Sequence, residues 1–362
     1  MVSVSITDKN FTGKDRTMQK LLTGAAYHGC RMLNHVEADM RDMADNHMNL
    51  VVHMMSHNDW ERHYQVMRNV VELSHEAGLE VWMDNWGLGG PPGDKSHFLS
   101  YHPEAHMIYS NGEMDPVRVC MNAPSFRQFM HEWIDAVALT GAESIFWDEP
   151  HIPVEDDGTY ACACPVCRKK FEEKYGRPMP EKMDEDAVNF RLDTITDYFN
   201  DVCGYAASKG LKNAVCVMLG EHNGIHLGTL DRICSVPALD NIGSDPYWGY
   251  SGVNPYEFVY RGTKRNLAVA DRFGKDHNIW IQAYNTPRGR EEEIVQAVEA
   301  AYDAGARTIL AWGYFGSISN DYGAENPYLV RAKLNQAFAR IWQWERDRIL
   351  ERNRQLVGSD GV

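Results

Sequence analysis

The sequence predicts a single (β/α)8 barrel, and three observations support this fold class. Eight short apolar segments alternate with longer amphipathic stretches, the pattern of parallel strands joined by helices. These apolar segments end in acidic, amide, histidine or aromatic residues, as barrel strands do at a functional face. No Gly-x-Gly-x-x-Gly follows the first segment, so the runner-up fold, a doubly wound open sheet, lacks its phosphate-binding fingerprint.

The eight strands are predicted from short apolar runs that end at Gly, Pro or charged residues. They are 21–27, 49–55, 79–84, 144–147, 214–218, 241–245, 278–282 and 308–312. Amphipathic periodicity and capping residues predict the clearest helices. These helices are 36–44, 60–77, 125–139, 165–175, 185–209 and 328–352. A stretch rich in Gly, Pro and His, 87–121, reads as a long loop.

Length and composition narrow the class of protein. The 362 residues show no internal repeat and no low-complexity linker, so we expect residues 1–362 to form one catalytic domain. A net charge of −15 argues against a nucleic-acid partner and, more weakly, against anionic membranes. No apolar run of about 18 residues predicts a membrane span, and the first residues lack a signal-peptide pattern. A cytoplasmic protein is therefore expected, without an organic cofactor, and a homo-oligomer is compatible with the sequence.

The segment Trp147-Asp148-Glu149-Pro150 carries the strongest catalytic signal. Adjacent residues of a strand project to opposite faces, so both acids can serve one site only if the chain leaves the strand here, as Pro150 indicates. Burial among Trp147 and Trp312 is expected to raise the pKa of Glu149, and the charge of Asp148 acts in the same direction. A carboxyl group with a raised pKa suits a general acid that protonates a glycosidic oxygen. A salt bridge or a loop cap is the plainer alternative, especially for Asp148.

The other strand ends suit a carbohydrate. Carboxylates and amides can bond to hydroxyl groups, and Trp and Tyr rings can stack on the C–H faces of sugar rings. The predicted substrate-binding residues are Asp84, Trp86, His151, Glu221, Tyr247, Gln282, Tyr284 and Trp312. Further strand ends carry Tyr27, His28, His53, His57, His222, Asp245, Trp248 and Tyr314. The histidines are too scattered in the sequence to predict a metal site.

A second motif, Cys162-x-Cys164-x-x-Cys167, has a spacing typical of metal sites. A structural zinc ion takes four ligands, so a fourth must come from elsewhere. Cys120 is the candidate, because it precedes the helix that leads into the strand with Glu149. The sequence thus predicts a structural zinc site in a loop insertion at about 150–180. The remaining cysteines, at 30, 203, 216 and 234, read as small core residues.

These residues together resemble the clan A glycoside hydrolases, and most closely the family 42 β-galactosidases. Cys120, the segment 147–150, the cysteine motif 162–167 and Phe171–Gly176 follow the order found in that family, and the resemblance spans about 103–176. It implies a (β/α)8 barrel, Glu149 as the acid/base and the four cysteines as zinc ligands.

The sequence departs from that family at two positions. Asp148 stands where the family usually has Asn, and Gln282 stands where clan A enzymes have a nucleophilic Glu. An amide cannot act as a base and is a poor nucleophile. Asp245 is then the best second carboxylate, followed by Asp84, Glu221 and Asp148.

Three catalytic schemes remain open. Asp148 as nucleophile with Asp245 as acid/base would be similar to barrel α-glycosidases. Glu149 as acid with a distant carboxylate activating water would invert the anomeric centre. Asp148 and Glu149 as a pair would resemble substrate-assisted N-acetylhexosaminidases, which need no nucleophile at the position of Gln282. The overall expectation is a glycoside hydrolase for short oligosaccharides or glycosides, and the rival is a non-catalytic carbohydrate-binding barrel.

Overall fold

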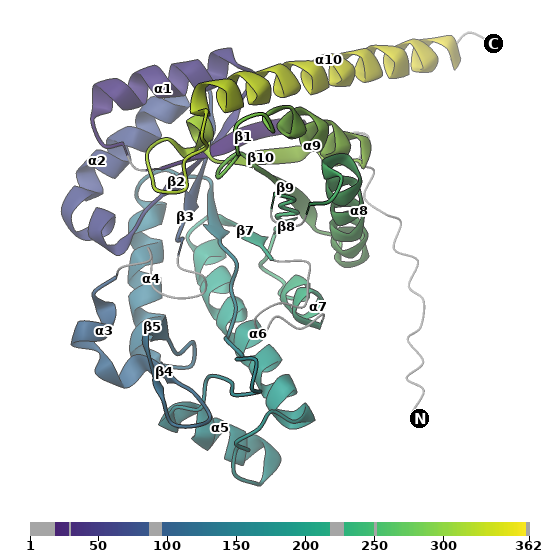
Figure 1. The fold of residues 1–362 in the computed structure, drawn as a ribbon. Helices are drawn as coiled ribbons and strands as arrows, with labels where there is room; N and C mark the ends of the chain where they lie inside the picture. The colour runs from purple at the N-terminus through teal and green to yellow at the C-terminus, as the bar shows by residue number, and fades with distance from the viewer. Residues whose placement is uncertain (1–18, 29, 87–95, 218–227, 250–251, 360–362) are drawn as a thin grey trace.

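The computed structural model describes residues 19–28, 30–86, 96–217, 228–249 and 252–359. Eight parallel strands close into a barrel in the order β1-β2-β3-β6-β7-β8-β9-β10. They are β1 (Leu22–Tyr27), β2 (Leu50–Met54), β3 (Glu80–Asp84), β6 (Ser144–Trp147), β7 (Lys212–Cys216), β8 (Asn241–Ser244), β9 (Asp276–Gln282) and β10 (Thr308–Trp312). This closed barrel confirms the predicted fold class and excludes the open sheet (Figure 1).

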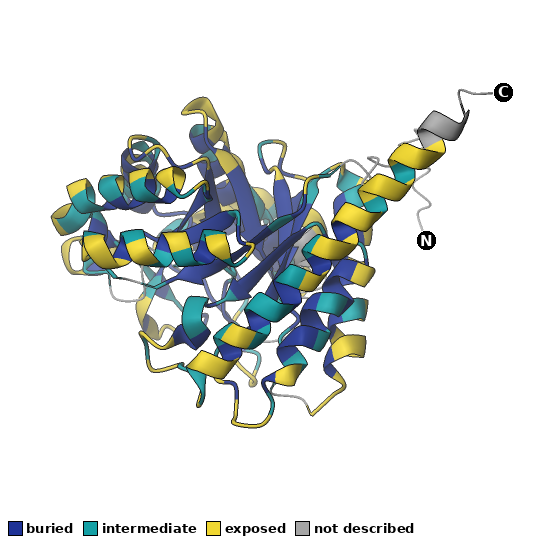
Figure 2. Ribbon diagram, turned by 90° about the horizontal axis from the view of Figure 1, so that it is seen from above, coloured by how far each residue is buried: buried dark blue, intermediate teal, exposed yellow. Residues whose placement is uncertain are grey.

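Helices follow the strands and cover the outside of the barrel (Figures 1 and 2). They are α1 (Leu33–Asp45), α2 (His57–Glu76), α4 (Pro124–Ala138), α6 (Glu185–Ser208), α7 (Gly228–Cys234), α8 (Pro255–Phe273), α9 (Glu292–Asp303) and α10 (Pro327–Ser359). Several begin at a residue whose side chain accepts a backbone N–H bond: Ser56 forms a capping box with Asp59, and Asp184 and Asn254 cap α6 and α8. None of the helices within the described ranges is long and apolar enough to cross a membrane.

Two insertions extend the barrel, the first between β3 and α4 and the second after β6. The first contains α3 (Phe98–Tyr101), a 3-10 turn η2 (Pro103–Ala105) and an antiparallel hairpin of β4 (His106–Ile108) and β5 (Met114–Val119). The second follows Glu149 and leads into α5 (Pro165–Tyr175). The hairpin lies inside the stretch predicted as loop, because β4 has only three residues and β5 contains Pro116, which is rare within strands.

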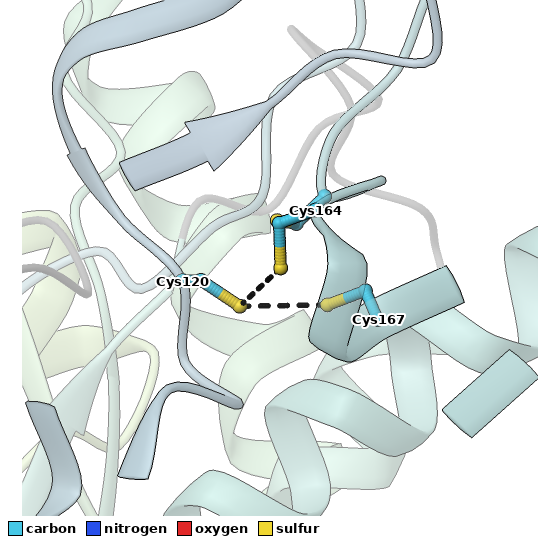
Figure 3. A group of neighbouring side chains, drawn as sticks. Cys120, Cys164 and Cys167 are labelled. Carbon is cyan, nitrogen blue, oxygen red and sulfur yellow. Dashed lines mark hydrogen bonds between the residues drawn. The ribbon is translucent and has the colours of Figure 1, made fainter. Parts of the chain in front are cut away.

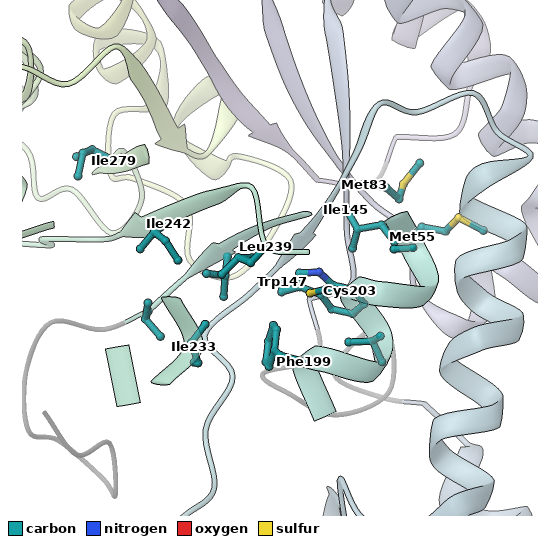
Figure 4. Packing of buried hydrophobic residues seen from close by; sticks show 14 of the residues in the cluster. Met55, Met83, Ile145, Trp147, Phe199, Cys203, Ile233, Leu239, Ile242 and Ile279 are labelled. Atoms are coloured by element: carbon teal, nitrogen blue, oxygen red, sulfur yellow. The ribbon is translucent and has the colours of Figure 1, made fainter. Parts of the chain in front are cut away.

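The strands alternate between two hydrophobic cores. One face of each strand fills the barrel interior, with the large side chains Trp82, Phe146 and Trp280. The other face packs against the helices, where Ile145, Trp147 and Phe199 lie in one cluster (Figure 4). This alternation has a period of two residues and therefore decides which residues at the strand ends point toward the barrel axis.

The position of Trp147 corrects one sequence expectation. Its ring packs edge-on against Phe199 of α6, with centroids 6.0 Å apart, and its Nε1 donates to Asn213 Oδ1 at 3.1 Å. Trp147 belongs to the outer core and does not form a wall around Glu149. Because Trp147 faces outward, its neighbours Phe146 and Asp148 lie on the inward face.

Candidate active site

The carboxyl ends of the strands place several acids on the inward face. Asp84 comes two residues after the interior residue Trp82, and Asp148 comes two residues after Phe146. Gln282 and Trp312 follow Trp280 and Leu310 by the same interval. In a barrel this end of the strands is where active sites form.

Asp84 is completely buried. Its Oδ1 accepts a bond from the backbone N–H of Trp86 at 2.6 Å, whereas its Oδ2 has no hydrogen-bond partner among the described residues. Burial raises the pKa of Asp84 to about 8, because a charged carboxylate loses its hydration and gains only one backbone bond. Asp84 therefore holds its proton at neutral pH.

Asp148, Glu149 and Asp245 form one electrostatic cluster. Burial raises the pKa of Asp148 well above its ordinary range, with further contributions from the charges of Asp84 and Glu149. Burial also raises the pKa of Asp245, followed by the charge of Glu149 and a side-chain hydrogen bond to it. Glu149 and Asp245 are thus close enough for their charges to interact strongly. Two neighbouring carboxyl groups cannot both be ionised at low cost, and the raised pKa of Asp245 keeps a proton on its carboxyl group.

The backbone turns at Glu149 and brings its side chain into this cluster. The φ angle of Glu149 is +31°, in the region that non-glycine residues rarely adopt. A continued strand would project Asp148 and Glu149 to opposite sides, and this turn removes that restriction. The next residues are held nearby, since His151 Nδ1 donates to the Glu149 carbonyl oxygen at 2.9 Å. Such strained backbone is found preferentially at functional sites.

Tyr247 and Tyr284 lie beside Asp245. Their rings meet edge to face with centroids 5.3 Å apart. Burial and the neighbouring charge of Asp245 raise the pKa of Tyr247 far above its ordinary value, so its hydroxyl stays protonated. Cys216, at the end of β7, is kept as a thiol because burial, followed by the charge of the neighbouring Asp245, raises its pKa. Tyr247 and Cys216 therefore surround Asp245 with neutral groups.

The side-chain amide of Gln282 forms hydrogen bonds with backbone atoms. Its Oε1 accepts from the Gly249 N–H at 2.9 Å, and its Nε2 donates to the Tyr284 carbonyl oxygen at 3.4 Å. The amide packs so closely under Gly249 that a Cβ at that position would come within 2.6 Å of it. An ionised glutamate at this position could accept the first bond but could not donate the second. Gln282 thus joins the chain after β8 to the end of β9.

Aromatic rings line the opposite part of the barrel end. Trp312 packs against His28 with centroids 4.8 Å apart, and Trp86 lies 6.3 Å from Trp312. His28 has its pKa lowered to about 4 by burial, so the ring is neutral, and its Nε2 is buried without a partner among the described residues. Two indole rings beside a neutral imidazole make a surface suited to sugar C–H groups.

Arg191 of α6 holds the segment after Glu149. Its side chain is buried, its Nε donates to the Ala161 carbonyl oxygen at 3.0 Å, and a terminal nitrogen donates to the carbonyl oxygen of Ile152. Burial lowers the pKa of Arg191 to about 10, still far above neutral pH. This guanidinium ties the irregular chain between β6 and α5 to the barrel.

The four cysteines Cys120, Cys162, Cys164 and Cys167 are buried together, with all sulfur atoms within 4.8 Å of one another. Cys120 lies directly after β5, and its sulfur is 3.4 Å from that of Cys167 and 3.6 Å from that of Cys164 (Figure 3). These separations are far longer than a disulfide bond and close to the edge of about 3.8 Å of a tetrahedron with metal–sulfur bonds of about 2.3 Å. A structural metal ion fits this group of donors.

The surroundings of the sulfur atoms fit a metal as well. The backbone N–H of Asn122 donates to Cys120 Sγ, and its side-chain amide donates to Cys167 Sγ, both at 3.4 Å. Such N–H···S bonds stabilise thiolates and orient them as ligands. The cluster joins the end of the β4–β5 hairpin to the first turn of α5, and so connects the two insertions.

The structure thus brings most of the predicted site residues to one end of the barrel. Asp84, Asp148, Glu149 and Asp245 are electrostatically coupled, and Trp86, Tyr247, Tyr284 and Trp312 lie around them, with Gln282 beneath Gly249 and His151 bonded to the chain after β6. Glu221 and His222 lie outside the described residues. The sequence did not point to Arg191, and it indicated only a core role for Cys216. For Cys216, its place near the end of a predicted strand was the available signal.

Comparisons with known proteins identify the fold. No protein-family model matches the sequence, and no curated protein matches it. The GH42 β-galactosidase Gan42B from G. stearothermophilus is similar in structure, with a TM-score of 0.70 and 13% identity over 92% of this chain and 58% of that one. This chain therefore spans little more than half of that β-galactosidase.

Two further structures are matched over nearly their whole length. The catalytic domain of a β-amylase from Paenibacillus polymyxa has a TM-score of 0.62 and 11% identity over 87% of this chain and 98% of that one. An endo-1,4-β-mannanase from Rhizomucor miehei has a TM-score of 0.60 and 9% identity over 90% and 95% of the two chains. At these identities the likeness establishes the barrel fold, and several glycoside hydrolases share it.

Proposed function

We propose that this protein is a glycoside hydrolase that cleaves a short oligosaccharide or glycoside, with Glu149 as general acid/base. The observation that carries the proposal is the electrostatic coupling of the buried Asp245 to Glu149, both of which follow the carboxyl ends of barrel strands. Glycoside hydrolysis needs one carboxylic acid and one carboxylate on either side of the scissile bond. A pair of carboxyl groups that retains one proton provides both forms at once.

The raised pKa of Asp245 keeps the proton of the pair on Asp245 in the free protein, so the mechanism requires that this proton passes to Glu149 when substrate binds. Glu149 then donates it to the leaving-group oxygen, and the ionised Asp245 attacks the anomeric carbon. The strong electrostatic coupling of Asp245 to Glu149 favours a short separation, as in retaining enzymes with about 5 Å, over the roughly 6.5–9.5 Å of inverting ones. Retention of the anomeric configuration is therefore part of the proposal. Asp148 and Asp84 stay protonated beneath the pair and limit the negative charge there.

The hydrogen bonds of the Gln282 side chain to backbone atoms support the assignment of the catalytic pair to Glu149 and Asp245. Its amide is already engaged at both ends, by Gly249 and by Tyr284, and serves to position the chain beside Asp245. The residue at this position thus has a structural task that a nucleophilic carboxylate could not perform.

A second candidate is a substrate-assisted N-acetylhexosaminidase that uses Asp148 and Glu149. The observation in its favour is that Asp148 lies on the inward face and is coupled to Glu149. In that scheme Asp148 orients an acetamido group of the substrate, which itself attacks the anomeric carbon. Hydrolysis of N-acetylated aryl glycosides together with inertness toward their 2-hydroxyl counterparts would select this scheme.

Aryl glycosides with different leaving groups test the assignment of roles. Glu149→Gln should lose about 10²–10⁴-fold in turnover of substrates with poor leaving groups, which need a proton, and much less with dinitrophenyl glycosides, which do not. Asp245→Asn should lose activity with both. Undiminished turnover of Glu149→Gln on a poor leaving group would refute the assignment. Sugar binding by calorimetry without release from any α or β glycoside would instead identify a non-catalytic binding barrel.

We further propose that Cys120, Cys162, Cys164 and Cys167 hold a structural zinc ion. The four thiolates would fill all coordination positions, so the ion would stabilise the two insertions and leave no position for substrate. The proposed partner of the protein is a carbohydrate alone, and a cytoplasmic location would suit reduced cysteines.

A further inference from the structure

A second group of ligand-type side chains lies on α2, apart from the carboxyl cluster and the cysteines. His57 opens α2, Glu61 follows one turn later, and His97 immediately precedes α3. His57 Nε2 lies 3.3 Å from Glu61 Oε1, and His97 Nε2 lies 3.3 Å from Glu61 Oε2. One ligand atom from each of the three residues falls within 4.8 Å of the other two.

The spacing of these atoms matches a metal site better than two ion pairs. With metal–nitrogen and metal–oxygen bonds of about 2.0–2.1 Å, the edge of a coordination tetrahedron is about 3.4 Å. Charge-assisted hydrogen bonds are usually shorter, about 2.7–2.9 Å. The imidazole rings of His57 and His97 stack with centroids 4.2 Å apart and an angle of 17° between planes. A metal ion lies in the plane of each imidazole that binds it, so one of the two stacked rings must turn for both Nε2 atoms to reach one ion. The side chain of His97 is 42% exposed and has room for this rotation.

The surroundings of His57 hold it in place as a ligand. Its Nδ1 lies 2.8 Å from Ser96 Oγ, which leaves Nε2 to face Glu61. Metal-bound histidines almost always have such a partner on the second ring nitrogen. The ring also packs edge-on against Phe129 of α4, with centroids 4.7 Å apart, and only 7% of its side chain is exposed. His57 is therefore fixed before any ion binds.

The two remaining ligands leave access for an ion. The side chains of Glu61 and His97 are 43% and 42% exposed, so water can complete the coordination. Two neutral imidazoles and one carboxylate carry a single negative charge, which suits a divalent cation. Nitrogen and oxygen donors in this ratio suit zinc and its neighbours in the first transition row.

We propose that His57, Glu61 and His97 bind a divalent transition-metal ion, with zinc as the natural candidate. The ion would join the first turn of α2 to the residues that begin α3. It would thereby anchor the chain that continues from β3, the strand that carries Asp84, while remaining outside the carboxyl cluster. This site is independent of the cysteine cluster, since the two share no residue.

Zinc stoichiometry in matched histidine variants tests the proposal. The full-length protein is dialysed against metal-free buffer without chelator, then titrated with Zn²⁺ at about neutral pH by calorimetry and by metal analysis after equilibrium dialysis. The test variant is His97→Ala, and the control is His102→Ala. His102 has the same exposure, pairs with Glu104 at 3.3 Å and belongs to no such trio.

The wild type and His102→Ala should bind one more zinc ion per chain than His97→Ala, or bind it at least about tenfold more tightly. Glu61→Gln, which keeps the size of the side chain, should weaken the same ion at least about tenfold. Equal stoichiometry and affinity in the wild type and His97→Ala would overturn the proposal. A wild-type protein that binds metal only at the cysteine cluster would also overturn the proposal.

Discussion

Replacing Asp84 with Asn should make the stability of this protein less dependent on pH. Asp84 is fully buried, one of its oxygens lacks a partner among the described residues, and its pKa is raised to about 8. Between about pH 4 and pH 8 the folded state keeps this proton while the unfolded chain has lost it. The folded state therefore loses relative stability as pH rises through this range, and the loss is complete above about pH 8.

The magnitude follows from the pKa in the two states. A folded-state pKa of about 8 against an ordinary 3.8 corresponds to about 6 kcal/mol, at about 1.36 kcal/mol per pKa unit. The neighbouring Asp148 shares this cost, because its own pKa is raised in part by the charge of Asp84. The asparagine of the variant would be neutral at every pH and could still accept the Trp86 N–H bond. We expect the variant to gain about 3–6 kcal/mol over the wild type at about pH 8 and little at about pH 4.

Urea unfolding followed by tryptophan fluorescence at about pH 4.5, 6 and 8 measures this difference. Asp157→Asn is a control of opposite sign. Asp157 is exposed, and hydrogen bonds from Thr159 hold its pKa below the ordinary value, so its carboxylate contributes stability at neutral pH that is lost as pH falls. That variant should be the less stable one near neutral pH. Parallel pH profiles of Asp84→Asn and the wild type would show that the proton on Asp84 does not control stability.

Two further substitutions test the positioning amide and the cysteine cluster. Gln282→Glu would place a carboxylate oxygen against the Tyr284 carbonyl oxygen, and this repulsion should cost about 2–4 kcal/mol of stability without raising turnover. Thermal unfolding measures the loss of stability, and aryl-glycoside assays measure turnover. A variant with faster turnover than the wild type would contradict the positioning role of Gln282. Cys120→Ser should release the zinc bound by the cysteines, whereas Cys203→Ala, a change at another buried cysteine, should retain it. Metal analysis of the two purified variants decides the second case, and equal zinc content would exclude Cys120 as a ligand.

The barrel could be predicted from the sequence because its signals are local. Each strand is a short apolar run that ends at a polar or glycine-rich break, and such runs depend on neighbours only a few residues away. The approximate strand ends also located Asp84, Asp148 and Asp245, since all three directly end or follow a strand. The hairpin at 106–119 was missed because β4 has only three residues and β5 is interrupted by Pro116.

Contacts between distant segments could not be predicted in the same way. Trp147 was expected beside Glu149 but packs outward on α6, because a strand with two buried faces gives no sign of which face is inward. The identity of Gln282 was visible in the sequence, whereas its bonds to Gly249 and Tyr284 depend on how the chain after β8 returns over β9.

The sequence by itself determined the fold class, the acids at the strand ends and the four grouped cysteines. Tertiary structure alone decided that Glu149 is electrostatically coupled to Asp245, that Asp84 is buried and that His57 and His97 lie beside Glu61. The physical reason is the closure of the barrel. Periodicity along a strand gives the direction of a side chain, but only the register between strands and the path of the connecting chain set the distance between two side chains.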